Sequence, residues 1–421
     1  MRNNFPKEGK MFEHKVFKRI LSDGNVLIFV PSLNFVSIVK EGDMVPDFIE
    51  SEKPIPQKII NAQNDFYPTG VTILTTNKCN LQCCYCYGSF RPGNFSFLPI
   101  NLGKKIVDFL IQNAIKIGRK SIRMSYFGGE PTQYWEFLEE INDYAKKMTE
   151  RYNILFGNSI STNGCITKQQ ADWLINNIKD IQISIDGFKT IQDRHRDNSF
   201  DRCYEIAKYF YSKQKYFNIR ATVSSVSVNV LENIVDFFVS EFPKSKIAFE
   251  PLSPCGRLSD PEIKDPNIDL FFKKLEKLYC TNNANIKSTL CQFSNSYNEN
   301  FCGVDQPNFF VTPDGEIVAC SRIDNDRVIN PFQYGYINNL GQIIIDREKM
   351  EFIRAIHVNN IVGCNNCFAK STCKGGCPSQ KLFLFGDGFS QKTLPTEVCK
   401  NICDLTEKRL LSKLNYKLSQ L

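Results

Sequence analysis

The chain has 421 residues, of which 42% are hydrophobic, so it is long enough for two or three globular domains. Its formal charge of +7 is modest for this length, and its lysines are interspersed with acidic residues, which argues against a nucleic-acid partner. It contains no apolar run long enough for a signal sequence or a membrane span, so we expect a cytoplasmic protein without a membrane partner. The 17 cysteines then predict metal ligation, because disulfides are rare in a reducing compartment.

In chain order, the first predicted unit covers residues 1–65. Two alternating apolar stretches, KVFKRIL and NVLIFV, flank the turn SDGN and predict a β-hairpin. We therefore expect a small N-terminal unit rich in β-structure.

Residues 66–255 have a different pattern, in which short apolar runs alternate with amphipathic helical stretches. The segment KKIVDFLIQNAIKI, for example, places Ile106, Phe109, Leu110, Ala114 and Ile117 on one helix face. This alternation predicts an α/β fold with a closed or partly closed parallel sheet, whose chemistry lies at the C-terminal strand ends. The predicted strands lie in VTILTTNKC, SIRMSYFGGEP, SISTNG, DIQISIDG, NIRATVS and KIAFEPL.

The rest of the chain lacks this alternation of apolar runs and helical stretches. Residues 256–295 are predicted to form a helical connector. Residues 296–421 contain short hairpins and many cysteines, with too few apolar runs to be held by a core alone. We expect this part to be a separate module.

The segment CNLQCCYC, residues 79–86, places four cysteines in eight positions. Cys79, Cys83 and Cys86 have the spacing C-x3-C-x2-C, and three thiolates on an iron–sulfur cube leave its fourth iron free for another ligand. Cys84 breaks this spacing and is expected to point elsewhere. The alternative is a zinc loop that borrows a histidine, but none of the three histidines of the chain is near in the sequence.

The stretch TTNKCNLQCCYC, with an aromatic residue before its last cysteine, resembles the signature of the radical S-adenosylmethionine (SAM) enzymes. The segments GGEP, STNG, SIDG, Asp193-x-x-Arg196 and RATV follow in the family's order, although Gln192 stands where the family commonly has histidine. In the family, GGEP contacts the SAM amino group, and the serine and arginine hold the SAM carboxylate and ribose, a task that suits the arginine fork. By this resemblance, the cofactor-binding residues are Tyr85, Gly128, Gly129, Glu130, Pro131, Asn163, Ser184, Arg196 and Arg220.

Each of these segments also has a purely structural explanation. GGEP fits an ordinary strand-to-helix turn with Pro131 near the helix start. SIDG fits a strand followed by an Asp-Gly turn, Arg196 fits a surface charge, and Arg220 fits a buried charge that needs a partner.

The later cysteines follow the order C…G-x4-C…C-x2-C-x5-C-x3-C, formed by Cys302, Gly315, Cys320, Cys364, Cys367, Cys373 and Cys377. This order resembles the SPASM extension of radical SAM enzymes, which holds two auxiliary iron–sulfur clusters. The turn Pro313-Asp314-Gly315 also predicts a tight hairpin that places Cys320 on the return strand. By resemblance, the first auxiliary cluster takes Cys302, Cys320 and Cys377, and the second takes Cys364, Cys367, Cys373 and Cys399.

Two ligand positions stay open in this assignment. Cys403 competes with Cys399 in the second set. The fourth ligand of the first set is either Cys291 or absent, which would leave an iron open to substrate. For the whole block, the alternative is a zinc ribbon.

The resemblance implies a partial (β/α)6 TIM-like barrel that uses SAM and three [4Fe–4S] clusters. Such an oxidoreductase cleaves SAM reductively to a 5′-deoxyadenosyl radical, and auxiliary clusters favour an oxidative outcome because they accept a second electron. SPASM enzymes mostly modify peptides or proteins, so we expect a peptide maturase that forms a thioether or carbon–carbon crosslink in a ribosomally synthesised precursor. Its electron donor would be a flavodoxin or ferredoxin. The precursor's leader would add a strand to residues 1–65, for which a capping hairpin is the alternative.

Two other functions stay open. One is formylglycine formation, as in anaerobic sulfatase maturases, but these usually carry an aspartate where this chain has Ser321. The other is a non-catalytic, zinc-stapled binding protein.

Overall fold

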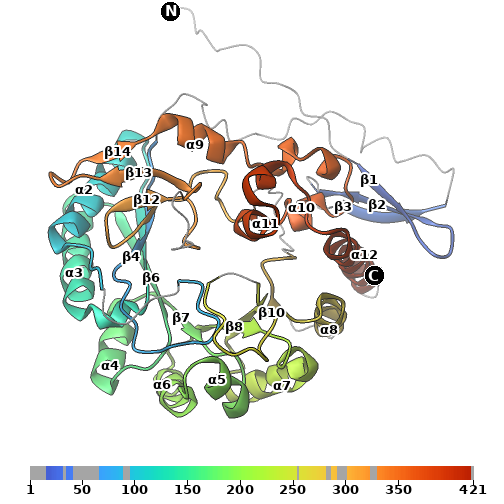
Figure 1. Ribbon diagram of the computed structural model, residues 1–421, viewed down its shortest axis with the longest axis horizontal. Helices are drawn as coiled ribbons and strands as arrows, with labels where there is room; N and C mark the ends of the chain where they lie inside the picture. The colour runs from blue at the N-terminus through green and yellow to red at the C-terminus, as the bar shows by residue number, and fades with distance from the viewer. Residues whose placement is uncertain are drawn as a thin grey trace, which may run out of the picture.

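Two sheets organise the protein. The structure, a computed structural model, describes residues 16–31, 35–40, 66–88, 95–253, 256–280, 286–291, 301–322 and 330–418. One sheet has eleven strands in the order β10-β9-β8-β7-β6-β5-β4-β11-β12-β13-β14, and the other has three in the order β1-β2-β3 (Figure 1). Among the described residues, no helix is both long and apolar enough to cross a membrane.

The six strands predicted between residues 66 and 255 all form, and each pairs in parallel with the next. Helices connect them and lie along the outside of the curved sheet (Figure 1). The predicted α/β fold, a partial (β/α)6 barrel, is therefore confirmed. Its strands are β4(Gly70–Leu74), β5(Ser121–Phe127), β6(Leu155–Thr162), β7(Asp180–Ser184), β8(Asn218–Val223) and β9(Lys246–Pro251), and its helices are α2(Ile100–Lys116), α3(Trp135–Arg151), α4(Lys168–Asn177), α5(Lys189–His195), α6(Phe200–Ser212) and α7(Leu231–Glu241).

Helix α2 shows how the apolar pattern fixes the barrel wall. Ile106, Leu110 and Ala114 are buried, because residues spaced by three and four lie on one helix face. Ile117 is an exception to the prediction. It is the residue at which the helix ends and is 43% exposed, so the apolar face stops one turn earlier than expected.

The predicted connector, residues 256–295, is not only helical. It contains α8(Ile268–Cys280), but β10(Ile286–Lys287) follows and pairs in parallel with β9. Residues 281–285 and 292–295 of this segment lie outside the described residues. The connector thus extends the barrel sheet before the chain leaves it.

The strands of the cysteine-rich part continue the sheet of the barrel. β11(Phe310–Val311) pairs in parallel with β4, and β12, β13 and β14 continue outward as an antiparallel meander. One apolar core runs through both parts, because two-residue and three-residue strands can share the barrel's core without an apolar layer of their own. The remaining elements are β12(Glu316–Val318), β13(Gln333–Ile337), β14(Ile343–Ile345), α9(Arg347–Arg354), α10(Lys370–Cys373), α11(Pro378–Phe385) and α12(Thr396–Leu418).

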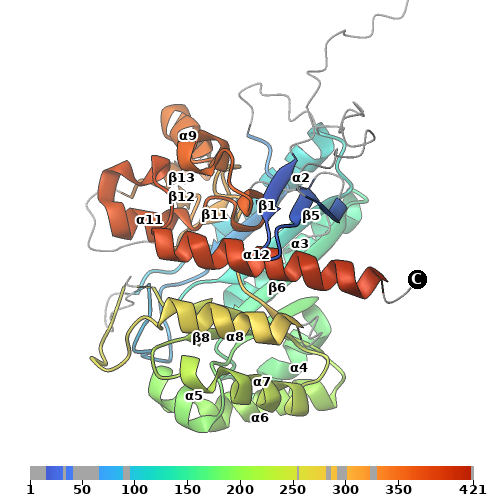
Figure 2. The ribbon, with the colours of Figure 1, turned by 90° about the vertical axis from the view of Figure 1, so that its right-hand side faces the viewer.

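The predicted N-terminal hairpin forms from β1(Phe17–Ile20) and β2(Val26–Val30), and β3(Phe35–Val39) adds a third antiparallel strand. Its apolar face packs against Phe368 and Leu410 of the C-terminal part. Figure 2 shows α12 as a long helix that runs across the molecule beside α8. The rest of the predicted unit 1–65 lies outside the described residues.

Candidate active site

The loop after β4 carries Cys79, Cys83 and Cys86 close to one another. Burial raises the pKa of Cys79 to about 12, and Glu130, Cys83 and Cys86 raise it further through their charges. Burial likewise raises the pKa of Cys83 to about 11. Ionised thiols are therefore costly here unless a positive metal centre accompanies them, as it does in metal sites. This set of three soft donors fits an iron–sulfur cluster.

Cys84 has a different environment from its neighbours. It is buried in a small apolar cluster with Tyr85, Leu252 and Ile263. Its backbone N–H donates to the carbonyl of His195, at 3.0 Å. As expected from its position in the sequence, Cys84 packs into the protein.

The two glycines of GGEP allow the loop after β5 to lie against the cysteine loop. A Cβ on Gly128 would lie 2.4 Å from the carbonyl oxygen of Thr76, and one on Gly129 would lie 2.4 Å from that of Lys78. Gly128 also has a φ of +138°, which is open mainly to glycine. Gly129 N–H donates to the Thr76 carbonyl at 2.8 Å. The segment thus does more than form a turn, because it holds the loop that carries Cys79.

Glu130 is buried, and its carboxylate links the ends of two strands. It accepts hydrogen bonds from the hydroxyl groups of Thr132 and Thr162, both at 2.8 Å, and from the backbone N–H of Asn163, at 2.7 Å. Burial raises the pKa of Glu130, while these hydrogen bonds oppose the increase. Pro131 follows as the first residue of a short 3-10 helix, Pro131–Gln133. The sequence pattern gave no sign of this link from β5 to β6.

Three other predicted cofactor residues lie at the same end of the barrel. Asn163 Nδ2 donates to Asn80 Oδ1 at 2.8 Å and lies 3.9 Å from Cys79 Sγ. Ser184 is the last residue of β7 and is partly exposed. Arg220, on β8, is exposed, so the alternative of a buried charge is wrong for it.

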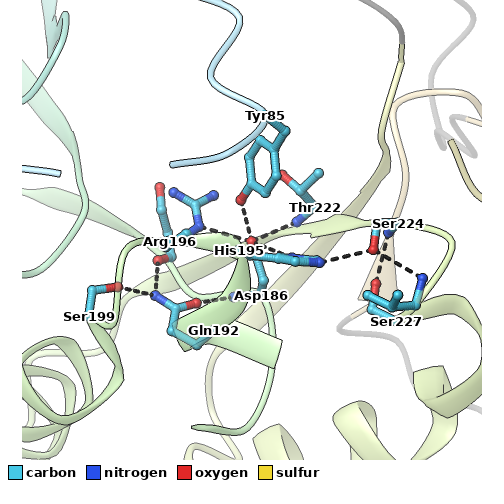
Figure 3. Close-up of polar contacts among 11 residues, drawn as sticks. Tyr85, Asp186, Gln192, His195, Arg196, Ser199, Thr222, Ser224 and Ser227 are labelled. Atoms are coloured by element: carbon cyan, nitrogen blue, oxygen red, sulfur yellow. Dashed lines mark hydrogen bonds and ion pairs between the residues drawn. The ribbon is translucent and has the colours of Figure 1, made fainter. Parts of the chain in front are cut away.

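Asp186, two residues beyond Ser184, is the centre of a buried polar network (Figure 3). Its Oδ2 accepts a hydrogen bond from the Tyr85 hydroxyl and lies 3.1 Å from Arg196 Nε. Its Oδ1 accepts from the backbone N–H of Thr222, at 2.9 Å. Burial alone would raise the pKa of Asp186, but Arg196, His195 and Tyr85 together lower it to about 2. Arg196 is therefore not an isolated surface charge, because it is paired with a buried carboxylate.

His195 belongs to this network, and sequence reasoning missed it. It is far from the cysteine loop along the chain. In the structure its ring centroid lies 5.4 Å from that of Tyr85. Its Nδ1 lies 3.0 Å from Asp186 and its Nε2 lies 2.9 Å from Ser224 Oγ. Both ring nitrogens are thus engaged, which argues against the zinc loop.

Comparisons with known proteins agree with this site. A family model described as the radical SAM superfamily matches residues 73–235. The chain is 24% identical over 372 residues to the cysteine-type anaerobic sulfatase-maturating enzyme of Clostridium novyi (strain NT), covering 81% of this chain and 94% of that protein. Residues 73–235 form a radical SAM domain. Two solved structures share the fold. AnSMEcpe with bound AdoMet has a TM-score of 0.65 at 20% identity and covers 82% of this chain and 99% of that one. Streptococcus suis SuiB bound to precursor peptide SuiA has a TM-score of 0.56 at 20% identity and covers 79% and 76%.

The predicted family, a radical SAM enzyme with a SPASM-type extension, is thereby confirmed, and so is its enzymatic nature. The matched segment contains the three cysteines of the first loop and the GGEP, SIDG and Arg196 positions. A radical SAM enzyme uses SAM and a [4Fe–4S] cluster. The alternative of a non-catalytic, zinc-stapled protein is wrong.

The structure of this radical SAM enzyme brings Cys302, Cys320 and Cys377 together. Burial raises the pKa of Cys302 to about 12, and the charges of Cys320 and Cys377 raise it further. The predicted hairpin forms from β11 and β12, with Gly315 at a φ of +79° in its turn, and Cys320 lies two residues beyond the end of the return strand. Cys377 immediately precedes α11.

Cys291 does not join this first auxiliary set. It is fully buried, and its pKa is raised by burial first and by Cys373 next. Its thiol is also hydrogen-bonded to Thr406. Cys291 therefore lies beside the second set, because the chain folds back after β10. The idea that it supplies the fourth ligand of the first set is not supported.

The second auxiliary set also assembles. Burial is the largest cause that raises the pKa of Cys373, and the charges of Cys399, Cys364 and Cys367 raise it further. Burial raises the pKa of Cys399 too, with Cys364 and Cys367 adding to it. Cys403 Sγ lies 3.8 Å from Cys367 Sγ. The charges of Cys364 and Cys367 thus raise the pKa of Cys399, and the charge of Cys399 raises the pKa of Cys373. Cys403 lies beside Cys367.

A zinc ribbon requires four donors around a single ion. Among the described residues, no three histidine, cysteine or acidic side chains converge tightly enough to hold one metal ion. The thiolates of an iron–sulfur cube bind different irons and lie farther apart.

Proposed function

We propose that this radical SAM enzyme oxidatively modifies a peptide by forming a thioether or carbon–carbon crosslink in a ribosomally synthesised precursor. The observation that carries the proposal is a contact between residues that adjoin Cys86 and residues that adjoin Cys320. Tyr87, next to Cys86, is hydrogen-bonded to Ser321, and its ring lies 5.9 Å from the guanidinium carbon of Arg322. Ser321 and Arg322 directly follow Cys320. The first auxiliary set thus lies near the SAM end of the barrel, where it suits an oxidative reaction.

In this proposal, Cys79, Cys83 and Cys86 hold the SAM cluster, and the two C-terminal sets hold auxiliary [4Fe–4S] clusters. When bound, these groups supply a hydrogen-abstracting carbon radical and an acceptor for the electron that a new bond releases. The chain's own residues hold the site in shape and exclude water. Arg196 and Arg220 place positive charge at this end of the barrel, which suits the carboxylate of SAM and that of a peptide.

A crosslink is favoured over formylglycine by the residue after Cys320. Sulfatase maturases, by the family resemblance, usually have an aspartate there, which can accept a proton. Ser321 is instead a weakly basic hydroxyl group that is bonded to Tyr87. Sulfatase maturation is the second candidate, because the Clostridium novyi relative covers most of both chains.

Two partners belong to the same proposal. A flavodoxin or ferredoxin would supply the electron for SAM cleavage. The precursor's leader would add a strand to the N-terminal sheet, in which β1 and β3 are the outer strands of the described residues.

The test uses anaerobically reconstituted enzyme, SAM and a chemical reductant with two kinds of peptide. One kind is each short cysteine-containing peptide encoded next to the gene, and the other carries a sulfatase cysteine motif. Peptide mass, fragmentation and 5′-deoxyadenosine are measured. We expect a neighbouring peptide to lose two hydrogen atoms and gain a crosslink, and the variant with Cys79, Cys83 and Cys86 changed to alanine to leave it intact. An aldehyde on the sulfatase peptide alone would favour the second candidate, and no change in any peptide would count against both.

A further inference from the structure

His195 occupies the meeting point of three chain segments. It is the last residue of α5, and its side chain is fully buried. Its ring connects Asp186, beyond β7, with Ser224, beyond β8. Its backbone carbonyl accepts the N–H of Cys84 in the cysteine loop, at 3.0 Å. One residue therefore links the cysteine loop to two strand ends.

The two ring nitrogens of His195 have complementary partners. The Asp186 carboxylate is ionised and can only accept, so Nδ1 carries the proton of this contact. The hydroxyl group of Ser224 accepts from the backbone N–H of Val226, at 3.3 Å, and can donate its own proton to Nε2. The imidazole ring, with a donor at Nδ1 and an acceptor at Nε2, can therefore make the contacts with Asp186 and Ser224 at the same time.

Asp186 in turn orients two groups at the SAM site. It accepts from the Tyr85 hydroxyl, and the Tyr85 ring is enclosed by His195 and Arg196, whose guanidinium carbon lies 5.4 Å from the ring centroid. Its ion pair with Arg196 is made through Nε, so the two terminal nitrogens of the guanidinium fork do not form that contact (Figure 3). These nitrogens are the ones that pair with a carboxylate in two places.

We propose that His195 is a positioning residue for SAM binding. It fixes the Asp186 carboxylate, which holds Arg196 and, through Tyr85, the loop of the SAM cluster. Because His195 is buried with both nitrogens engaged, it acts through Asp186 and does not touch SAM. The proposal depends on the radical SAM identity of the chain and is independent of which substrate is modified.

Two substitutions separate the two contacts of His195. In His195→Asn, the amide nitrogen can replace Nδ1 as the donor to Asp186. In His195→Gln, the amide group reaches toward Ser224 and the bond to Asp186 is lost. The matched control is Arg194→Lys, on the same helix, because Arg194 points outward to Asp260 and Glu262.

The measurements are iron content, SAM affinity, and the electron paramagnetic resonance spectrum of the reduced SAM cluster with and without SAM. We expect His195→Gln to keep its iron, to bind SAM roughly tenfold more weakly, as loss of a hydrogen bond to a charged group predicts, and to show a smaller SAM-induced spectral change. Arg194→Lys should resemble the wild type, and His195→Asn, which loses only the contact with Ser224, should bind SAM about threefold more weakly, as loss of a neutral hydrogen bond predicts. Wild-type affinity and spectra in His195→Gln would overturn the proposal, and so would equal defects in His195→Asn and His195→Gln.

Ser224→Ala keeps the test decisive if His195→Gln does not fold. This variant leaves the histidine in place and removes one of its two anchors. We expect full iron content, SAM affinity reduced by about threefold, from loss of a neutral hydrogen bond, and a broadened SAM-bound spectrum. An unchanged affinity and spectrum would overturn the proposal.

Discussion

The SAM end of the barrel and the cysteine-rich C-terminal part hold their polar groups in different ways. At the barrel end, buried carboxylates such as Asp186 and Glu130 are surrounded by donors from the chain itself. In the C-terminal part, cysteines lie on short elements such as α10, and Lys381 is buried beside Cys364, Cys373, Cys377 and Cys399. The barrel end is thus shaped by protein contacts, whereas the C-terminal part has a buried charge that the expected clusters would balance.

The largest expected effect tests whether the SAM site is separable from the auxiliary sets. Changing Cys79, Cys83 and Cys86 together to alanine should abolish 5′-deoxyadenosine formation, because these are the thiolates proposed to hold the SAM cluster. Iron should fall from about twelve to about eight atoms per chain, as three cubes becoming two requires. Iron and sulfide analysis on anaerobically reconstituted protein provides the measurement. A fall to near zero would show that the two regions depend on each other.

Metal removal should affect the two regions unequally. With all iron chelated, we expect amide hydrogen exchange to become fast in residues 301–322 and 358–403 and to stay slow in β4–β9. The reason is that the C-terminal thiols are buried beside one another on short elements, whereas the parallel strands are held by their pairing with one another. Mass-spectrometric exchange on metal-loaded and metal-free protein measures this difference. Uniform loss of protection would contradict the comparison.

Gly129→Ala should loosen the contact between the GGEP segment and the cysteine loop. The new Cβ would lie 2.4 Å from the backbone oxygen of Lys78, and backbone cannot shift cheaply. We expect a loss of about 1–3 kcal/mol in the free energy of unfolding, together with weaker iron binding by the SAM set alone. Thermal unfolding and iron analysis provide the measurements. Gly388→Ala, where a Cβ would meet nothing within 4 Å, is the control and should change neither.

Lys381→Met should change the reduction potential of the auxiliary clusters without preventing their assembly. Lys381 is only 1% exposed, and burial lowers its pKa while Cys364, Cys373, Cys377 and Cys399 raise it. A positive charge beside a cluster favours the reduced form, so its removal should lower the reduction potential, on the order of 60 mV for a tenfold effect in a one-electron couple. A redox titration followed by electron paramagnetic resonance measures it. Lys392→Met, at an exposed position, should leave the potential unchanged, and equal potentials in both variants would refute the idea.

The sequence predicted the barrel well because the patterns that mark its strands and its cysteine loop lie within short stretches of the chain. Apolar runs mark β4–β9, and the spacing of Cys79, Cys83 and Cys86 marks the loop after β4. What it did not show depends on contacts between distant segments. The two-residue strands β10 and β11 have no periodicity to detect, so the extension of the sheet on both sides was missed.

The same limit explains the errors within the site. Cys291 is close to Cys302 in sequence but lies beside Cys373, because chain distance does not report how the chain folds back. His195 is distant from Cys86 in the sequence, but the end of α5 brings it to the cysteine loop. The sequence did contain two signs of a role for His195. It is one of only three histidines in the chain, and it directly precedes Arg196.

The smallest expected effect concerns the N-terminal sheet and its attachment to α12. Arg19 pairs with Asp404 and Glu407 and lies 5.9 Å from the Phe368 ring, next to Cys367. Because the pair is partly exposed, Arg19→Gln should cost about 1 kcal/mol or less in the free energy of unfolding.

Faster amide exchange in β1–β3 should accompany the loss of this pair, because Arg19 anchors the sheet to the C-terminal helix. A double-mutant cycle with Glu407→Gln isolates the interaction. Arg123→Gln is the matched control, since its pair with Asp180 is more exposed, at 64% and 46% for the two side chains, and should contribute almost nothing. If both arginine variants behave alike, the apolar contact of the sheet with Phe368 and Leu410 is sufficient for attachment. The sheet would then depend on the cysteine-rich part through packing alone, and its amides should respond to iron removal as strongly as the residues around Cys367.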